Sequence, residues 1–107
     1  MASMSVYRTG HQQCSGGYHR GLEVRDFYLI HFVMEGGGVY TLNGRKHPVR
    51  KGQAFLIYPS MPIDYQADAA DPWEFCWVGF NGNDARLLMN ATGFTPQNPV
   101  ITLKDPE

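Results

Sequence analysis

Aromatic residues recur at alternate positions in residues 71–80, DPWEFCWVGF, and make this stretch the best candidate for binding a ligand. In an extended strand Phe75 and Trp77 point to the same side, and Tyr65 lies on the strand expected just before them. For Trp73, at the start of the strand, two positions stay open, the rim of the barrel and its core. A sugar stacks its C–H face on an aromatic ring and bonds its hydroxyl groups to polar side chains, so this set predicts a saccharide pocket. The alternative is that the rings only fill the interior, and periodicity alone favours that alternative.

Two polar residues on the predicted strand 27–35 are candidates for the same pocket. His31 and Glu35 share one face of this strand with apolar neighbours, where polar groups are unusual. They could contact a ligand, or act on it as acid and base. The alternative is that His31 is a hydrogen-bonded core residue and that Glu35 lies in solvent at the end of the strand.

Metal binding and nucleophilic catalysis are not predicted. The four histidines form no His-x-His pair and no helical His-x-x-x-His pair, so no local metal-chelating spacing is present. Cys76 faces away from Trp77 and is expected to be a small buried residue, and Ser60 lacks a Gly-x-Ser-x-Gly context. We therefore predict no metal, no other cofactor and no enzyme activity.

Composition and charge indicate one soluble domain. The chain has 107 residues, and its 9 basic and 10 acidic residues give a net charge of −1. It has no basic run that would neutralise a phosphate backbone, so this chain itself is not expected to bind nucleic acid. It also has no apolar segment long enough to span a membrane and no secretory signal, which predicts a cytoplasmic protein.

Short apolar runs separated by Gly, Pro and Asn predict an all-β fold. The expected strands are residues 27–35, 39–42, 45–49, 53–58, 63–67, 73–80 and 100–103. Asn43-Gly44 is typical of a tight type I′ hairpin, and Pro48 belongs at a sheet edge or a strand end. Antiparallel strands of this number hide their edges by closing into a barrel or a jelly roll.

The two ends of the chain differ from this pattern. Residues 1–22 are polar and contain several glycines, which predicts an irregular arm or a short edge strand. Residues 85–90 predict one short C-terminal helix, which Asn83 or Asp84 would cap and Gly93 would end.

From about Val6 to Gly82 the chain resembles the N-terminal effector-binding domain of AraC-type transcription regulators. The resemblance is to the branch linked to oligosaccharide and galactoside operons of Gram-positive bacteria. It rests on the segments YLIHFVMEGGG, KGQAFLIYP, YQAD and DPWEFCWVGFNG. It implies a cupin barrel that lacks the metal ligands of cupin enzymes.

The resemblance also implies roles for individual residues. It places the sugar-stacking indole on Trp77 and neighbouring pocket positions on Phe75 and Tyr65. Glu35 stands where the arabinose-responsive member has an arginine, and His31 lies further inward on the same strand. An N-terminal arm can fold over the ligand in this family, which adds three weaker candidates: Tyr7, Arg8 and His11.

The resemblance further implies a division of the chain. Residues 1–22 would be the arm, residues 23–82 the cupin barrel core, and residues 83–107 the start of a helical linker and dimerisation region. The DNA-binding helix-turn-helix domain would lie outside this chain.

The predicted function is therefore metal-free sensing of a small effector, expected to be a sugar. The chain would be part of a larger regulator, and its candidate assembly is a homodimer. It would reach DNA through the missing domain and would not bind a membrane. Two alternatives remain. One is a small cupin enzyme, a sugar isomerase or lyase that uses His31 and Glu35, and the other is a purely structural dimerisation module.

Overall fold

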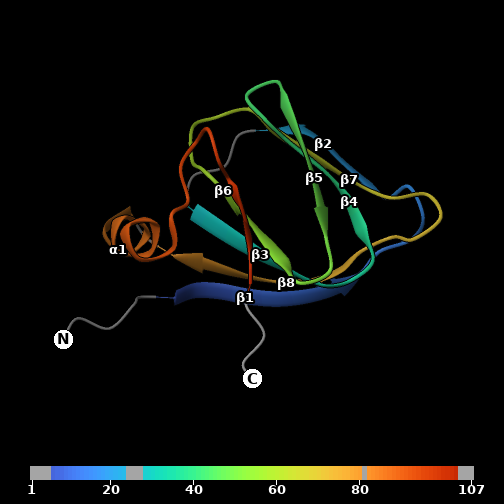
Figure 1. Ribbon diagram of the computed structural model, residues 1–107, viewed down its shortest axis with the longest axis horizontal. Coiled ribbons are helices and arrows are strands. Elements are labelled where there is room, and N and C mark those ends of the chain that lie inside the picture. Colours follow the sequence, from blue (N-terminus) through green and yellow to red (C-terminus); the bar gives the residue numbers. More distant parts are fainter. Residues whose placement is uncertain (1–5, 24–27, 81, 104–107) are drawn as a thin grey trace.

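The computed structural model describes residues 6–23, 28–80 and 82–103. Within these residues the chain forms nine strands and one helix (Figure 1). The strands are β1 (Val6–Gln13), β2 (His19–Glu23), β3 (Tyr28–Glu35), β4 (Gly37–Leu42), β5 (Arg45–Arg50), β6 (Gln53–Ile57), β7 (Ile63–Ala67), β8 (Glu74–Phe80) and β9 (Val100–Thr102). The helix α1 is Gly82–Thr92.

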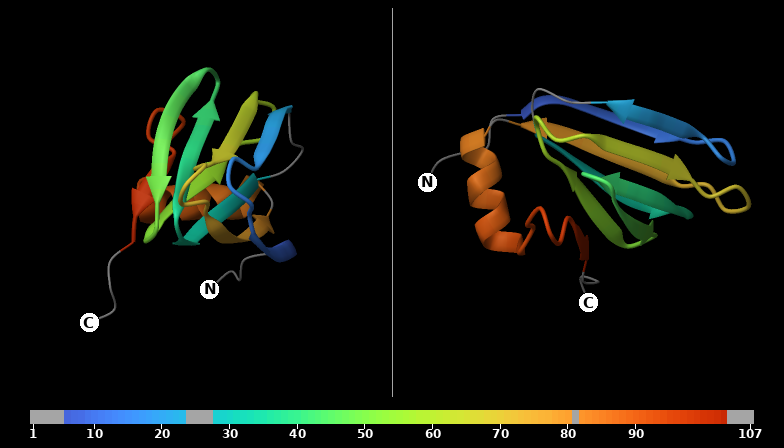
Figure 2. Two further views of the ribbon diagram at one scale, coloured as in Figure 1. Left: turned by 90° about the vertical axis from the view of Figure 1, so that its right-hand side faces the viewer. Right: turned by 90° about the horizontal axis from the view of Figure 1, so that it is seen from above.

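The strands pair into two antiparallel sheets. One sheet has the order β1-β8-β3-β6-β9 and the other the order β2-β7-β4-β5. Figures 1 and 2 show the sheets on opposite sides of a shared interior. This arrangement confirms the predicted all-β architecture with one short helix near the C-terminus.

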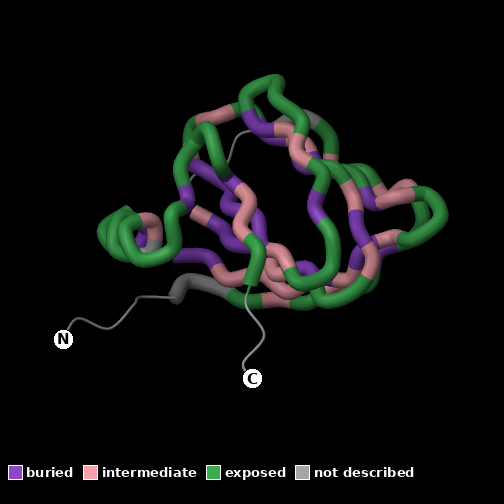
Figure 3. Tube along the Cα trace, in the orientation of Figure 1, coloured by how far each residue is buried: buried purple, intermediate pink, exposed green. Residues whose placement is uncertain are grey.

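Side-chain alternation along each strand decides what faces this interior. On β7, Ile63, Tyr65 and Ala67 are buried, whereas Asp64 and Gln66 between them are more exposed. Figure 3 shows the same contrast along the chain, with buried residues on the strands and exposed residues in the turns. β7 therefore aims one set of side chains at the core and the other at solvent, whereas β6 is buried on both faces from Ala54 to Ile57.

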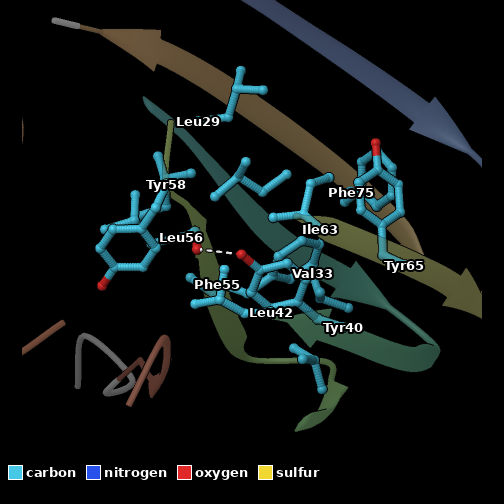
Figure 4. Close-up of a cluster of buried hydrophobic side chains, with 14 of the residues drawn as sticks. Leu29, Val33, Tyr40, Leu42, Phe55, Leu56, Tyr58, Ile63, Tyr65 and Phe75 are labelled. Carbon is cyan, nitrogen blue, oxygen red and sulfur yellow. Dashed lines mark hydrogen bonds between the residues drawn. The ribbon is translucent and has the colours of Figure 1, made fainter. Parts of the chain in front are cut away.

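A tyrosine joins the two sheets inside the core. The buried Tyr40 of β4 donates a hydrogen bond from its hydroxyl to the carbonyl oxygen of Leu56 on β6, at 2.8 Å (Figure 4). Its ring stacks on Phe55, with 4.7 Å between the ring centroids. Burial raises the pKa of the Tyr40 hydroxyl, and likewise that of Tyr58, because the phenolate would lose its water.

The hairpin between β4 and β5 confirms the turn prediction. Asn43 has a φ of 51° and Gly44 a φ of 84°, as a type I′ turn requires. β5 is the last strand of its sheet, so Pro48 lies on an edge strand as expected. Local turn chemistry therefore sets the register of this hairpin.

The N-terminal segment contributes more to the fold than an arm would. β1 is the edge strand of the larger sheet and pairs with β8 from Val6 opposite Phe80 to Gln13 opposite Glu74. β2 is the edge strand of the other sheet and pairs with β7. Of the two expectations for this segment, the edge strand is the one observed, once in each sheet.

The helix is longer than predicted. It begins at Gly82 rather than Ala85, and its last turn closes where the Gly93 N–H donates to the Met89 carbonyl oxygen at 2.9 Å. Asp84 lies in the first turn, where a carboxylate is favourable near the positive end of the helix dipole. Figures 1 and 2 place α1 beside the end of β8. Among the described residues, no helix has the length and apolar character needed to cross a membrane.

Candidate functional site

A small cavity lies where the two sheets meet at β1, β2, β3, β7 and β8. Its volume is about 110 Å³, and its walls contain Gln12, Arg20, Leu29, His31, Tyr65, Phe75 and Trp77. Four of the five predicted site residues therefore share one cavity. Three larger surface hollows, of about 310, 390 and 520 Å³, have no Trp, Tyr or Phe in their walls.

Stacked and perpendicular rings surround His31. Its imidazole, with 2% of its surface exposed, lies parallel to Phe55 at 4.8 Å between ring centroids and perpendicular to Phe75 at 4.7 Å. Tyr65 approaches from the opposite sheet, with its ring centroid 5.3 Å from that of His31 and 5.9 Å from that of Phe75. Figure 4 shows Tyr65 beside Phe75. Trp77 completes the cluster at 6.0 Å. His31 is thus both packed in the core and part of the cavity wall.

Trp77 is the accessible aromatic residue of this cavity. It is half-buried, whereas Tyr65 and Phe75 keep at most 4% of their surface exposed. Trp77 stands between Gly10 on β1 and His31 on β3. A Cβ atom at residue 10 would overlap the indole ring, so only glycine lets the ring lie over β1.

Three cavity residues were not among the predicted ones: the apolar Leu29 and the polar Gln12 and Arg20. Gln12 pairs with Phe75 across β1 and β8, and Arg20 pairs with Tyr65 across β2 and β7. Paired residues of neighbouring strands point to the same face of a sheet. Their pairing with Phe75 and Tyr65 indicates that Gln12 and Arg20 face the cavity. This pairing can be recognised only when the partner strands of β1 and β2 are known.

Glu35 does not join the other predicted residues. It is 62% exposed, and its carboxylate lies 3.4 Å from the ammonium group of Lys51. The pairing of β3 with β8 is irregular between Val33 and Glu35, which interrupts the alternation that would have turned Glu35 inward. The structure therefore separates His31 from Glu35.

Of the weaker candidates in the N-terminal segment, His11 lies apart from the cavity. The imidazole of His11 is on the outer face, 2.6 Å from the carboxylate of Glu74. The side chains of Tyr7 and Arg8 lie outside those that the structure describes.

The chemistry of the walls suits binding through stacking and hydrogen bonds. The guanidinium group of Arg20 is a planar donor, and the amide group of Gln12 both donates and accepts. No carboxylate is present among the residues that line the cavity. Within the described part of the chain, no three His, Cys, Asp or Glu side chains gather as a metal ion would need.

Comparison with known proteins identifies the family. Residues 5–107 match the family model of the AraC-like ligand binding domain. The chain belongs to this family. The AraC-like domain is 37% identical over 86 residues to the Msm operon regulatory protein of Streptococcus mutans, covering 80% of this chain and 31% of that protein. It is 36% identical over 76 residues to the raffinose operon transcriptional regulatory protein RafR of Pediococcus pentosaceus, covering 67% and 27%.

The AraC-like domain therefore spans about a third or less of the curated relatives that it matches. Its fold is that of the cupins, as solved cupin structures with the same arrangement show. One such match is a predicted oxalate decarboxylase from Thermotoga maritima, with a TM-score of 0.62, 18% identity, and coverage of 71% of this chain and 67% of that chain. At this identity the likeness shows the fold alone. The predicted family and cupin fold are both confirmed.

Proposed function

We propose that this AraC-like domain is the sensor of a cytoplasmic transcription regulator and binds a small saccharide in the cavity below Trp77. The observation that supports this most is the half-buried Trp77 indole beside the polar groups of Gln12 and Arg20. Its relatives are regulatory proteins of the msm and raffinose operons. A regulator of sugar utilisation responds to the sugar or to a related metabolite, and the stacking surface of Trp77 favours the sugar.

Each group in the cavity has a distinct role in this proposal. The Trp77 indole stacks on the C–H face of a sugar ring, and Arg20 and Gln12 bond its hydroxyl groups. His31, Tyr65 and Phe75 form the closed bottom of the site, because at most 4% of each is exposed. The cavity of about 110 Å³ is smaller than the roughly 300–1,000 Å³ of pockets for drug-sized ligands, so we propose that only one sugar ring binds, lying against Trp77 and partly outside the cavity.

Binding rather than catalysis is the proposed activity. An isomerase or lyase built on His31 and Glu35 needs both groups at the substrate. Glu35 is instead exposed and paired with Lys51. The bound sugar acts by favouring one arrangement of the complete regulator, a homodimer in this proposal, which contacts DNA through a separate domain.

Saccharide titrations test the proposal. Raffinose, lactose, sucrose, galactose, glucose and fructose are added at up to millimolar concentration, and the melting temperature and tryptophan fluorescence are recorded. At least one sugar is expected to raise the melting temperature and to change the emission of Trp77. A Trp77→Ala variant is expected to lose the response, whereas Leu87→Ala, on an exposed position of α1, keeps it. The absence of any response in the unmodified chain would refute the proposal.

A further inference from the structure

Two histidine–carboxylate pairs connect the edge strands to the interior strands of the sheets. On the outer face of the larger sheet, Nε2 of His11 lies 2.6 Å from the Glu74 carboxylate and joins β1 to β8. On the outer face of the other sheet, Nε2 of His19 lies 2.9 Å from both carboxylate oxygens of Asp64 and joins β2 to β7. An ionised carboxylate only accepts hydrogen bonds, so in both pairs the imidazole donates.

Each pair stands next to a polar residue of the cavity. His11 precedes Gln12, and His19 precedes Arg20. Successive side chains of a strand point to opposite faces. In both sheets the histidine therefore bonds a carboxylate on the outer face, and the residue that follows it points into the cavity.

The backbone alone holds these places weakly. β1 and β2 are the last strands of their sheets, so a neighbouring strand bonds each of them on one side only. The pairing of β2 with β7 is irregular between Arg20 and Glu23, directly after the residue that enters the cavity. A side-chain pair at this point restricts how far Arg20 can move.

We propose that His11–Glu74 and His19–Asp64 are positioning pairs that hold Gln12 and Arg20 in the sugar-binding geometry. This inference rests on the function proposed above, since it assigns these four outer residues to the affinity of the same cavity. The four residues are positioning residues because none of them lines the cavity. The pairs are partly exposed, so they contribute little to global stability. Their effect is on the local positions of Gln12 and Arg20.

Side-chain NMR of the 107-residue chain tests the positioning without a ligand. Nuclear Overhauser contacts are measured from the Gln12 amide to the Phe75 ring and from the Arg20 Nε–H to the Tyr65 ring. Glu74→Ala is expected to weaken the first contact, and Asp64→Ala the second. The conservative variants Glu74→Gln and Asp64→Asn keep an acceptor for the imidazole N–H and are expected to restore most of each contact.

A matched control is the exposed pair between Arg50 and Asp71, 3.7 Å apart, which involves neither β1 nor β2. Asp71→Ala is expected to leave both contacts unchanged. If Glu74→Ala and Asp64→Ala also leave them unchanged, the positioning role is overturned.

Raffinose titration of the same variants measures the consequence for binding. Because exposed pairs contribute modestly, each alanine variant is expected to raise the Kd about two- to fivefold, and the two effects to multiply. An unchanged Kd alongside weakened contacts would overturn the link between positioning and affinity. If neither raffinose nor any other sugar of the panel binds the unmodified chain, the proposed function fails, and the NMR contacts still decide whether the pairs position Gln12 and Arg20.

Discussion

Trp73, directly before β8, and Trp77, on β8, have opposite surroundings. Trp73 is fully buried, with its ring 5.4 Å from Phe55, and its indole N–H has no hydrogen-bond partner among the described residues. Trp77 is half-buried and lines the cavity. Each ring lies over a glycine: Trp73 over Gly38 of β4 in the opposite sheet, and Trp77 over Gly10 of the neighbouring strand β1.

The difference lies in the strands that carry those glycines. Gly38 belongs to β4, which has a partner strand on both sides, whereas Gly10 belongs to the edge strand β1. The same device, an aromatic ring over a glycine, therefore makes a closed core at one place and an accessible binding surface at the other. Trp73 is expected to matter for stability and Trp77 for recognition.

The largest expected effect is that of Trp73→Ala. Removing a fully buried indole leaves a large cavity and should lower the free energy of unfolding by about 3–5 kcal/mol. Urea unfolding measures the loss. The comparison predicts a clearly smaller loss for Trp77→Ala, and equal losses would contradict it.

Gly10→Ala is expected to separate recognition from stability. Its new Cβ atom overlaps the Trp77 ring, so the indole must move, at a cost of about 1–3 kcal/mol in stability. Sugar affinity should fall at least about tenfold, because the stacking surface moves with the ring. Gly82→Ala serves as a control for the loss of a glycine, since an added Cβ atom at the start of α1 would meet only the Tyr28 ring, at 4.0 Å. A Gly10→Ala variant with unchanged affinity would show that the indole position is unimportant.

Alkaline pH should lower the folding stability through two buried tyrosines of the core, Tyr40 and Tyr58. Burial raises the pKa of Tyr40 and Tyr58 above the ordinary value of about 10. Above that pH the unfolded chain releases these protons while the folded chain retains them, so stability is intact below about pH 10 and falls above it. The slope is about 1.4 kcal/mol per pH unit for each tyrosine. Unfolding measured from pH 9 to 12 should show stability beginning to fall near pH 10 and approaching this slope about one pH unit higher, and the double variant Tyr40→Phe/Tyr58→Phe should reduce the loss.

Glu35→Gln should have the smallest effect. Both Glu35 and Lys51 are mostly exposed, so stability should change by less than about 0.5 kcal/mol. Sugar affinity should stay within about twofold, since the cavity does not include Glu35. Calorimetric titration checks this, and a large loss of affinity would return Glu35 to the binding site.

Local chemistry made most of the fold predictable. The strands at residues 28–35, 53–57 and 63–67 follow from apolar runs between turn residues, and the hairpin follows from Asn43-Gly44. The shared face of Phe75 and Trp77 followed from alternation along a single strand, whereas their assignment to a pocket with Tyr65 came from the family resemblance. These features depend on neighbours in the sequence, so one sequence was enough to find them.

Long-range pairing explains what was missed. β1 and β2 are polar and glycine-containing, and their strand character comes from pairing with β8 and β7. Gln12 and Arg20 could not be assigned before those partners were known. Glu35 was misplaced for a related reason, because the irregular pairing near the end of β3 breaks the alternation used to orient it.

The edge position of β1 and β2 has a consequence for how a ligand enters. Each strand is attached by one ladder, and amides held in this way exchange with solvent through local opening at a lower free energy than global unfolding. Gln12 and Arg20 thus belong to strands that are expected to open locally while the hydrogen bond between Tyr40 and Leu56 still joins the two sheets. The binding site is therefore expected to open by local separation of β1 or β2, without unfolding of the domain.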